Sequence, residues 1–493
     1  MLMLEAICVR FNRPNPDSRC PFRPLFLQSS AFLMPVCAPS MISRLFMRSD
    51  SVRLRVILIT MAALLFVIRP SLAQEVVTSP SESDAPTSYS SSTQSALQSF
   101  AQPTNPGVHY VLHGASDVSS EPRRFQYGLQ LAFRGVYDDN INITNTGHIS
   151  DYYFTFEPVL TLGFGDIDGQ ENNYLRLDYL PAFSFFLDHS ENNAFQNVID
   201  LRGLHSFGRL TLTLLEEVAI LDGTDLRSLS NQTSPGTNPN LDVASRQQYQ
   251  TYQTRLNANY NLSGKTFLSG GIDSLIYDYN SSSLLSSGDV SGNLFINYIY
   301  SDKLVVGLGG TGGYNFVESP NPDETFEQAN IRLSYRATGK VAFNFSGGVE
   351  FRQFQDSSRD TYISPVFELS AIYTPFDGTA IVLTGTRRTY NSAVIGGQDF
   401  AGTNITASFR QRFLQRIYLG VIGGYDNSDY FSTVSSASAN RVDDYYFIEP
   451  SVDVSITRFW SFGAYYLHRQ NDSSLSSFSF NDNQVGFRTA LVF

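Results

Sequence analysis

Charged residues that alternate with apolar ones are the part of this sequence with the clearest chemical meaning. In 331–336, 341–352, 405–412, 446–456 and 484–493, large apolar residues take every second position and polar or charged residues lie between them. This period of two is that of a β-strand, whose successive side chains point to opposite faces. A charge in the middle of a bilayer costs about 2–4 kcal/mol, so the charged face must meet water. We therefore predict an inward, water-facing lining made of Arg332, Arg336, Glu350, Arg352, Arg410, Arg412, Asp453 and Arg488.

Two interpretations of this lining stay open. Fixed charge in a narrow aqueous pore biases which ions enter, because walls of low dielectric focus the field. Alternatively, the arginines and carboxylates pair with one another and form a neutral, hydrated wall. Both can hold in one molecule.

Other residues with chemical potential have simpler explanations. His205-Ser206 has the elements of a nucleophile and base, but no orienting Asp or Asn can be assigned to it. Asp166–Glu171 contains part of a calcium-loop pattern but lacks its spacing, and an Asp-Gly turn explains it. We expect no catalytic residue, no metal site and no cofactor, and hence no enzyme.

The N-terminal region has the three parts of a secretory signal peptide. Arginines precede the 13-residue apolar run 56–68, and Ser71-Leu72-Ala73 places small residues before a cut at Gln74. The run is too short to span a bilayer as a helix. We predict a leader over 1–73, of which 1–40 could be a start-site artefact. All three cysteines fall within it, so the mature chain has no disulfide or thiol chemistry.

Composition narrows the rest of the chain. Residues 74–122 are rich in Ser, Pro, Thr and Gln, which predicts a disordered periplasmic segment. Charged residues make up only 16% of the 493, whereas 38 Phe and 27 Tyr bring the aromatic fraction to 13%. The net charge is −12, which argues against nucleic acid as a partner.

From residue 123 onward, tight turns alternate with longer polar loops. Eight turns, such as Ser263-Gly264-Lys265 and Thr338-Gly339-Lys340, and nine loops rich in Asn, Ser, Asp and Gly make seventeen connections. The expected fold is an all-β, transmembrane, antiparallel up-and-down barrel of about 18 strands, with short periplasmic turns and long outer loops. Prolines within four strands oppose this count, because proline cannot donate to a ladder: Pro158, Pro181, Pro365 and Pro450.

The last ten residues carry the alternation to the end of the sequence. Val485, Phe487, Leu491 and Phe493 fall on one face of a strand. We expect this strand to close the barrel, with Phe493 at the periplasmic interface. A strand in a soluble β-sandwich is the alternative for this stretch taken alone.

Two stretches resemble a known family. Gly135-Val136-Tyr137-Asp138-Asp139-Asn140-Ile141, together with the closing hairpin 444–493, is similar to the β-barrel porin type 2 family of outer-membrane proteins. The resemblance covers about 125–493. It implies an outer-membrane barrel, with a channel or a link to exopolysaccharide export, and no catalytic residues.

Two functions are compatible with these expectations. The first is a passive outer-membrane channel for small polar solutes or saccharides. The second is a non-conducting envelope barrel or an accessory to exopolysaccharide export. The expected partners are outer-membrane lipid, the barrel-assembly machinery and, for the second function, polysaccharide. The expected location is the outer membrane of a Gram-negative-type bacterium.

Overall fold

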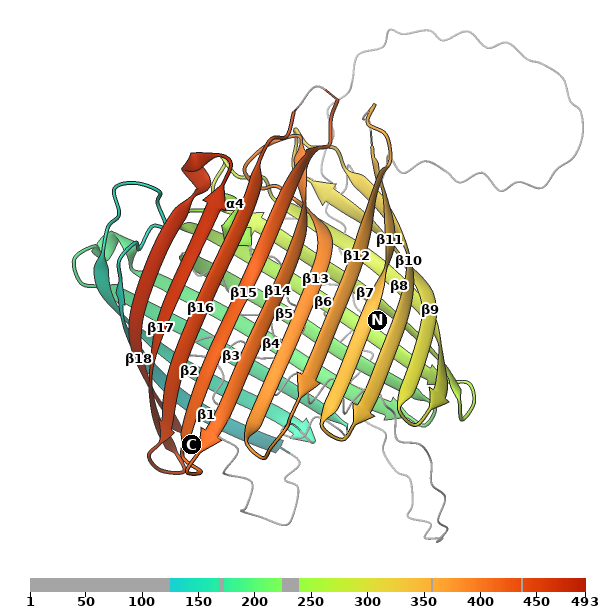
Figure 1. Cartoon of the computed structure of the whole chain (residues 1–493), viewed down its shortest axis with the longest axis horizontal. Coiled ribbons are helices and arrows are strands. Elements are labelled where there is room, and N and C mark those ends of the chain that lie inside the picture. Colours follow the sequence, from blue (N-terminus) through green and yellow to red (C-terminus); the bar gives the residue numbers. More distant parts are fainter. Residues whose placement is uncertain (1–124, 166, 168–172, 224–238, 356–357, 436–437) are drawn as a thin grey trace, which may run out of the picture. The chain divides into compact units, whose positions relative to one another are not determined.

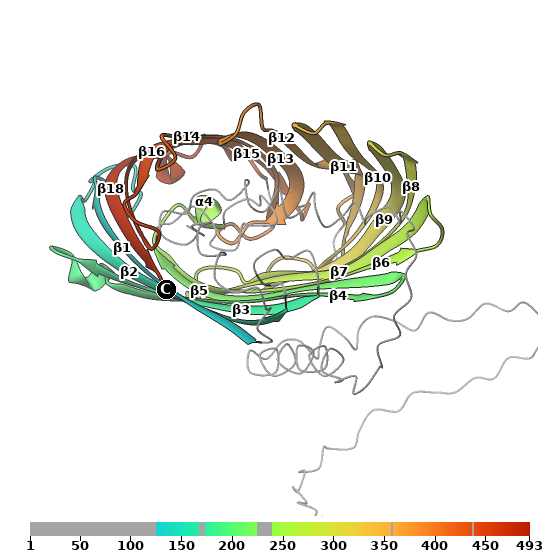
Figure 2. The same ribbon diagram turned by 90° about the horizontal axis from the view of Figure 1, so that it is seen from below.

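Eighteen antiparallel strands form one closed barrel (Figures 1 and 2). The structure is a computed structural model that describes residues 125–165, 167, 173–223, 239–355, 358–435 and 438–493. The predicted leader, 1–73, and the Ser/Pro-rich segment, 74–122, lie outside the described residues. The strands are β1 (Phe125–Asp138), β2 (Asp151–Gly165), β3 (Tyr174–Phe186), β4 (Ala194–Phe207), β5 (Leu210–Gly223), β6 (Gln247–Asn261), β7 (Thr266–Tyr279), β8 (Ser287–Ser301), β9 (Leu304–Val317), β10 (Glu324–Thr338), β11 (Val341–Phe354), β12 (Tyr362–Tyr373), β13 (Thr379–Asn391), β14 (Gln398–Phe413), β15 (Ile417–Ser432), β16 (Val442–Ser455), β17 (Trp460–Ser473) and β18 (Phe480–Val492).

Each strand pairs with its neighbours in sequence, and β18 pairs with β1. The up-and-down topology and the count of 18 strands are thus confirmed. Within the described ranges, three short helices lie in the loops: η1 (Ser190–Asn192), α4 (Pro239–Val243) and η2 (Ser476–Phe478). In the same part of the chain, the helices are all too short or too polar to cross a bilayer.

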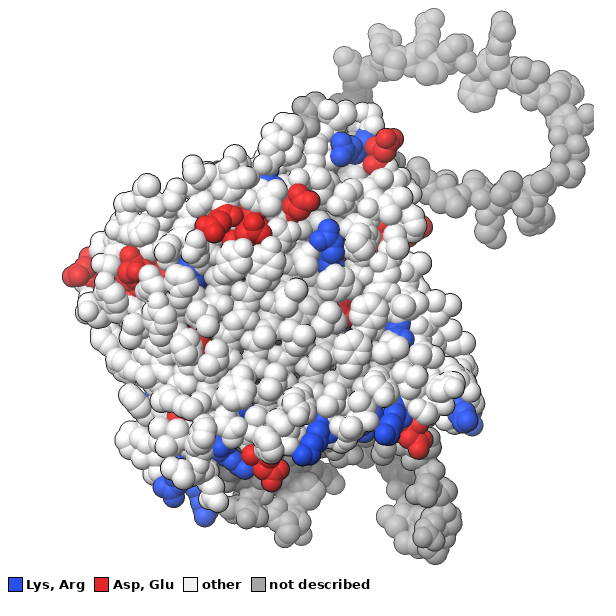
Figure 3. All heavy atoms as spheres, in the orientation of Figure 1, with Lys and Arg blue, Asp and Glu red and all other residues white. Residues whose placement is uncertain are grey.

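The alternation of the sequence divides each strand between an outer and an inner face. On β2, Tyr152, Phe156 and Leu160 are exposed, whereas Thr155 and Glu157 are buried. Figure 3 shows the consequence on one side of the molecule, where a broad, largely uncharged band separates charges gathered toward the two rims. An apolar belt between charged rims is what contact with lipid requires.

The two rims have different connections. At one rim, turns of a few residues join β4 to β5, β6 to β7, β8 to β9 and β10 to β11. At the other rim lie the longer loops, such as 139–150 and 433–441. The barrel begins and ends at the rim with the turns, where β1 starts and β18 finishes (Figure 1).

The four prolines fit the barrel because each faces a gap in a ladder. The register of β2 with β3 runs from Phe156↔Phe183 to Leu160↔Tyr179 and skips the residues between, where Pro158 and Pro181 fall opposite one another. Pro450 lies in a similar gap between β16 and β17. Pro365 pairs with β11 on one side and has no β13 partner on the other. The lost donors therefore coincide with pairings that are not made.

Phe493 lies directly beyond β18. Its N–H donates to the Leu129 carbonyl at 2.8 Å, and its own carbonyl accepts from the Leu129 N–H at 3.3 Å. Its side chain is 67% exposed. The structure thus places Phe493 at the seam between the first and last strands.

Candidate functional site in the barrel lumen

Ion pairs cover much of the inner wall. Arg134 pairs with Glu157 at 3.1 Å across β1 and β2, and Arg255 pairs with Asp273 at 2.5 Å across β6 and β7. Further pairs follow on other strands: Arg176–Asp178, Asp200–Arg202 and Glu368–Arg388. When opposite charges on the wall pair, their attraction offsets part of the free-energy cost of removing them from water, so both groups can stay ionised.

Four of the predicted lining residues lie in such pairs. Arg352 contacts Glu350 at 3.0 Å and Glu324 at 2.5 Å, and its side chain is only 4% exposed. Arg488 donates two hydrogen bonds to Asp453, at 2.9 and 2.7 Å. Arg352 and Glu350 share β11, whereas Arg352–Glu324 and Arg488–Asp453 join different strands on the inner face. In these two places the lining is a paired wall.

Three of the other predicted residues have different surroundings. Arg332 lies over the ring of Phe295 at 3.4 Å, and Arg410 lies over the ring of Tyr418 at 4.7 Å. Within the described residues, no ion pair with a carboxylate is formed by Arg332, Arg410 or Arg412. Arg336, Arg410 and Arg412 are exposed, and all lie toward the rim with the short turns.

The short helix α4, which precedes β6, lies inside the barrel. Seen from below, α4 lies inside the ring of strands (Figure 2). Its Asp242 is 3% exposed and accepts hydrogen bonds from the Ala393 N–H at 2.6 Å and the Tyr430 hydroxyl at 2.7 Å. Arg441 contacts the same carboxylate at 3.3 Å. Burial raises the pKa of Asp242, and Arg441 and the hydrogen bonds oppose this shift.

Arg441 makes polar contacts that hold α4 in place. Its side chain is fully buried, and it pairs with Asp443 at 2.5 Å as well as with Asp242. The guanidinium also lies between the rings of Tyr430 and Phe478, at 4.5 and 3.6 Å. Because the planar ion contacts two rings and two carboxylates at once, these contacts together fix its orientation.

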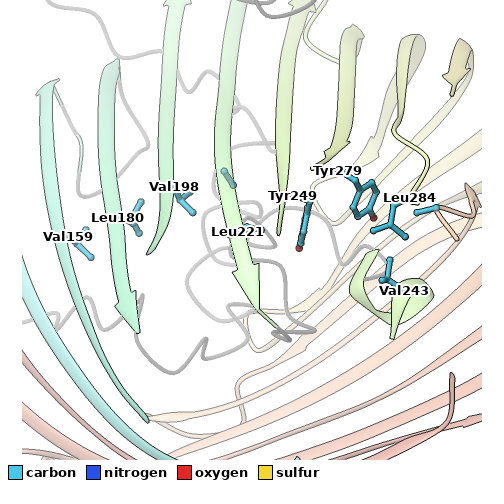
Figure 4. Close-up of a cluster of buried hydrophobic side chains, with 10 residues drawn as sticks. Val159, Leu180, Val198, Leu221, Val243, Tyr249, Tyr279 and Leu284 are labelled. Carbon is cyan, nitrogen blue, oxygen red and sulfur yellow. The ribbon is translucent and has the colours of Figure 1, made fainter. Parts of the chain in front are cut away.

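Apolar contacts complete the attachment of α4. Val243 belongs to a cluster that continues as a band of side chains along the inner face of neighbouring strands (Figure 4). On the other side, Leu241 packs in a second cluster with Ile143, Tyr445 and Phe480. The helix therefore narrows the lumen as a packed part of the protein. The members of the first cluster are Val159, Leu180, Val198, Ala219, Leu221, Val243, Tyr249, Tyr279, Leu284 and Ala393.

The β13–β14 hairpin also bends inward at the rim with the longer loops, where it separates from β12. Pairing of β12 with β13 ends at Phe367↔Arg387, although β13 continues to Asn391. Across that gap, the ring of Tyr362 on β12 stacks on Phe431 of β15, with centroids 3.9 Å apart. β14 stays paired with β15 as far as Gln398↔Ser432, so the hairpin end separates from β12 but not from β15.

The displaced hairpin end packs against the inner face of β9 and β10. The Asn315 amide of β9 donates to the Asn391 side chain at 2.5 Å and to Glu324 of β10 at 3.2 Å. Asn391 in turn donates to Asp399 at 3.1 Å. The hairpin tip also touches α4, since Ser392 donates to Asp242 at 3.2 Å. Helix and hairpin therefore form one constriction, which we define as residues 239–246 and 389–401.

This constriction is absent from the sequence-based expectations. The Asn, Ser, Asp and Gly content of 222–245 and 391–397 predicts outer loops for both segments. One feature of the sequence does hint at a buried segment: the acidic residue Asp242 lies between two apolar residues, Leu241 and Val243. Its partner, Arg441, is 199 residues away, so the pairing depends on the closed barrel.

The other chemical candidates have ordinary contacts. The Ser206 hydroxyl lies 3.2 Å from that of Thr211, and the His205 ring packs edge-on against Phe207, with centroids 4.1 Å apart. The two side chains are therefore engaged elsewhere than with one another. Most of Asp166–Glu171 lies outside the described residues.

A closed 18-stranded barrel with an apolar outer belt and a charged inner wall defines an outer-membrane barrel of the porin type. The expected location, the outer membrane of a Gram-negative-type bacterium, is thereby confirmed.

No family model matches the chain, and no curated protein matches it. It is similar in fold to OpdK from Pseudomonas aeruginosa, crystallised with vanillate, with 11% identity, 75% of this chain and 99% of that chain covered, and a TM-score of 0.39. A BenF-like porin from Pseudomonas fluorescens Pf-5 has 12% identity, the same coverages and a TM-score of 0.39. OccAB3 from Acinetobacter baumannii has 10% identity, the same coverages and a TM-score of 0.38. Likeness at these TM-scores gives no information on the function of this chain.

Proposed function

We propose that this protein is a passive channel for small polar solutes, narrowed by the constriction. The polarity of the inner wall is the observation that supports this function. A barrel that serves only as a scaffold has no need of ion pairs along the lumen, whereas water and hydrophilic solutes do need a wall that replaces their hydration. Barrels of this strand number are wide enough for an aqueous path.

We further propose that the channel prefers anions. Arg410 and Arg412 are exposed on the inner face between the constriction and the rim with the turns. Fixed positive charge in a pore concentrates anions and repels cations. The paired residues, Arg352–Glu350 and Arg488–Asp453, are nearly buried, so we assign the ion preference to the exposed arginines instead.

We also propose that the chain reaches the outer membrane after a leader is cut before Gln74. The short turns then face the periplasm and the long loops face outward. N-terminal sequencing of protein extracted from the outer-membrane fraction tests the cut. A chain that still carried residues 1–73 would contradict it.

A second candidate function is supported by the extent of packing in the outer half of the lumen. Arg441, Asp242 and the clusters around α4 are buried, as they would be in a barrel that conducts nothing and serves the envelope or a polysaccharide exporter. Solute entry separates the two functions. Liposomes that contain the folded protein should swell in isotonic solutions of small polar solutes, and the rate should fall as solute size rises.

Liposomes formed without protein are the control. Swelling equal to theirs for the smallest solute would favour the non-conducting barrel. Swelling that does not depend on solute size would contradict a narrow passage.

A further inference from the structure

Three successive turns at one rim share a sequence and a geometry. They join β6 to β7, β8 to β9 and β10 to β11, and they read Ser263-Gly264-Lys265, Ser301-Asp302-Lys303 and Thr338-Gly339-Lys340. In each, the hydroxyl of the first residue accepts the backbone N–H of the lysine, at 3.2, 3.3 and 3.1 Å. The repeated hydrogen bond places all three lysines alike at the tip of a turn.

These are the only lysines in the sequence. Two of them are also held by their side chains, since Lys303 Nζ donates to the Ala337 carbonyl at 3.3 Å and Lys340 Nζ to the Pro375 carbonyl at 2.6 Å. Each of these two ammonium groups therefore points along the rim toward the turn of the next hairpin. Consecutive turns are two strands apart, which spaces the lysines by about 10 Å along the rim.

Exposed tyrosines stand directly above this row on the outer face. Tyr260, Tyr300 and Tyr335 lie near the ends of the strands that lead into the three turns, and they are 43%, 68% and 42% exposed. Tyrosines of this kind mark the depth at which a bilayer changes from hydrocarbon to headgroups. A lysine just beyond them lies at the level of the lipid phosphates, where its charge and its apolar stem are both accommodated.

The charge around the row is predominantly positive. Among the described residues of these three turns, Asp302 is the only acid. The opposite rim is acidic, with Asp139, Glu318 and Asp444 among its residues. The rim with the turns therefore offers the more favourable charge for a phosphate.

We propose that Lys265, Lys303 and Lys340 form a binding surface for the headgroups of acidic phospholipids in the leaflet that the short turns face. An ammonium is a compact charge that suits a phosphate, and the three lysines together span several neighbouring headgroups. The surface selects lipid by charge. It is independent of whether the lumen conducts.

The test is the lipid preference of the folded barrel, measured by electron paramagnetic resonance with spin-labelled phosphatidylglycerol and phosphatidylcholine in mixed vesicles. The wild-type barrel should associate preferentially with phosphatidylglycerol. Each lysine should contribute up to about fivefold at low salt, and the preference should fall as salt rises. In the triple variant K265Q/K303Q/K340Q the preference should fall close to that for phosphatidylcholine.

A second triple variant, R209Q/R416Q/R458Q, removes the same charge from other turns of this rim. It should keep most of the preference. Equal losses in the two triple variants, or no preference in the wild type, would overturn the proposal. If the lysine triple variant fails to fold, the three single variants replace it, and each should lower the preference by a similar factor.

Discussion

Arg441 and Asp242 join two segments that lie 199 residues apart in the chain. Their side chains meet inside the barrel at 3.3 Å, where Arg441 is fully buried and Asp242 nearly so. α4 is thereby held against the residue that directly precedes β16. Together with the hydrogen bonds from Ser392 and Tyr430 to Asp242, this contact holds α4 in the lumen.

Replacing Arg441 with Met should release α4. The substitution keeps much of the side-chain volume but leaves Asp242 and Asp443 without their shared cation, which costs about 3–5 kcal/mol for a buried pair. Hydrogen exchange of residues 239–246 should become faster while exchange in the strands is unchanged. Arg388→Met is the control, because the Arg388–Glu368 pair is about half exposed and worth about 0–1 kcal/mol. Equal exchange in both variants would show that α4 does not depend on Arg441.

The inward position of the β13–β14 hairpin can be tested by cross-linking. The Asn315 and Asn391 side chains touch, so N315C/N391C should be joined by a short bifunctional thiol reagent. If β13 instead continued along β12 in register, Asn391 would lie opposite Ile363. The pair I363C/N391C should therefore remain unlinked. Linked peptides from the second pair and none from the first, seen by mass spectrometry, would contradict the inward hairpin.

Neighbouring residues on β14 should respond in opposite ways to the same charge. Phe409 is exposed on the outer face, whereas Ser408 lies on the inner face. Phe409→Arg should lower the free energy of unfolding in lipid vesicles by about 2–4 kcal/mol, because the charge would meet hydrocarbon. Ser408→Arg should cost far less, since it meets water. Leu333→Arg should behave like Phe409→Arg, and equal unfolding midpoints in urea for all three variants would refute the assignment of faces.

Charge on the lumen wall should decide ion preference. Changing Arg332, Arg336 and Arg410 together to Ser should shift the reversal potential under a salt gradient toward cation preference, on the order of several-fold in permeability ratio. The change should leave the fold intact, because Ser is small and common on the inner faces. The exposed turn residue Arg458, changed to Ser, is the control and should have little effect. An unchanged reversal potential in a folded, conducting triple variant would mean that these arginines do not line the ion path.

The barrel can be predicted from the sequence because its determinants are local. The alternation around Arg332 and Phe409, and the turn residues at Lys265 and Lys340, each specify a face or a reversal within a few residues. Pro158 and Pro181 argue locally against strands at their positions. The structure removes the objection, because both fall in a gap of the β2–β3 register that the sequence does not show.

The constriction cannot be predicted in this way, because the polar contacts that build it join distant parts of the chain. Asp242 meets Ser392, Tyr430 and Arg441 only after the barrel has closed. Ion pairing of the lining is undecided by the sequence for the same reason. Phe480 begins β18 at the edge of the last long loop, as its sequence position predicts, but its burial to 3% exposure depends on packing against Leu241 of α4.

Single-channel recording from the purified, folded protein in a planar bilayer tests the central claim most directly. A channel narrowed by the constriction should give discrete conductance steps, and Arg441→Met should make these steps larger or noisier, since α4 would no longer be fixed. Bilayers that contain folded wild-type barrels and show no steps, with Arg441→Met equally silent, would contradict the proposed channel and favour a non-conducting envelope barrel.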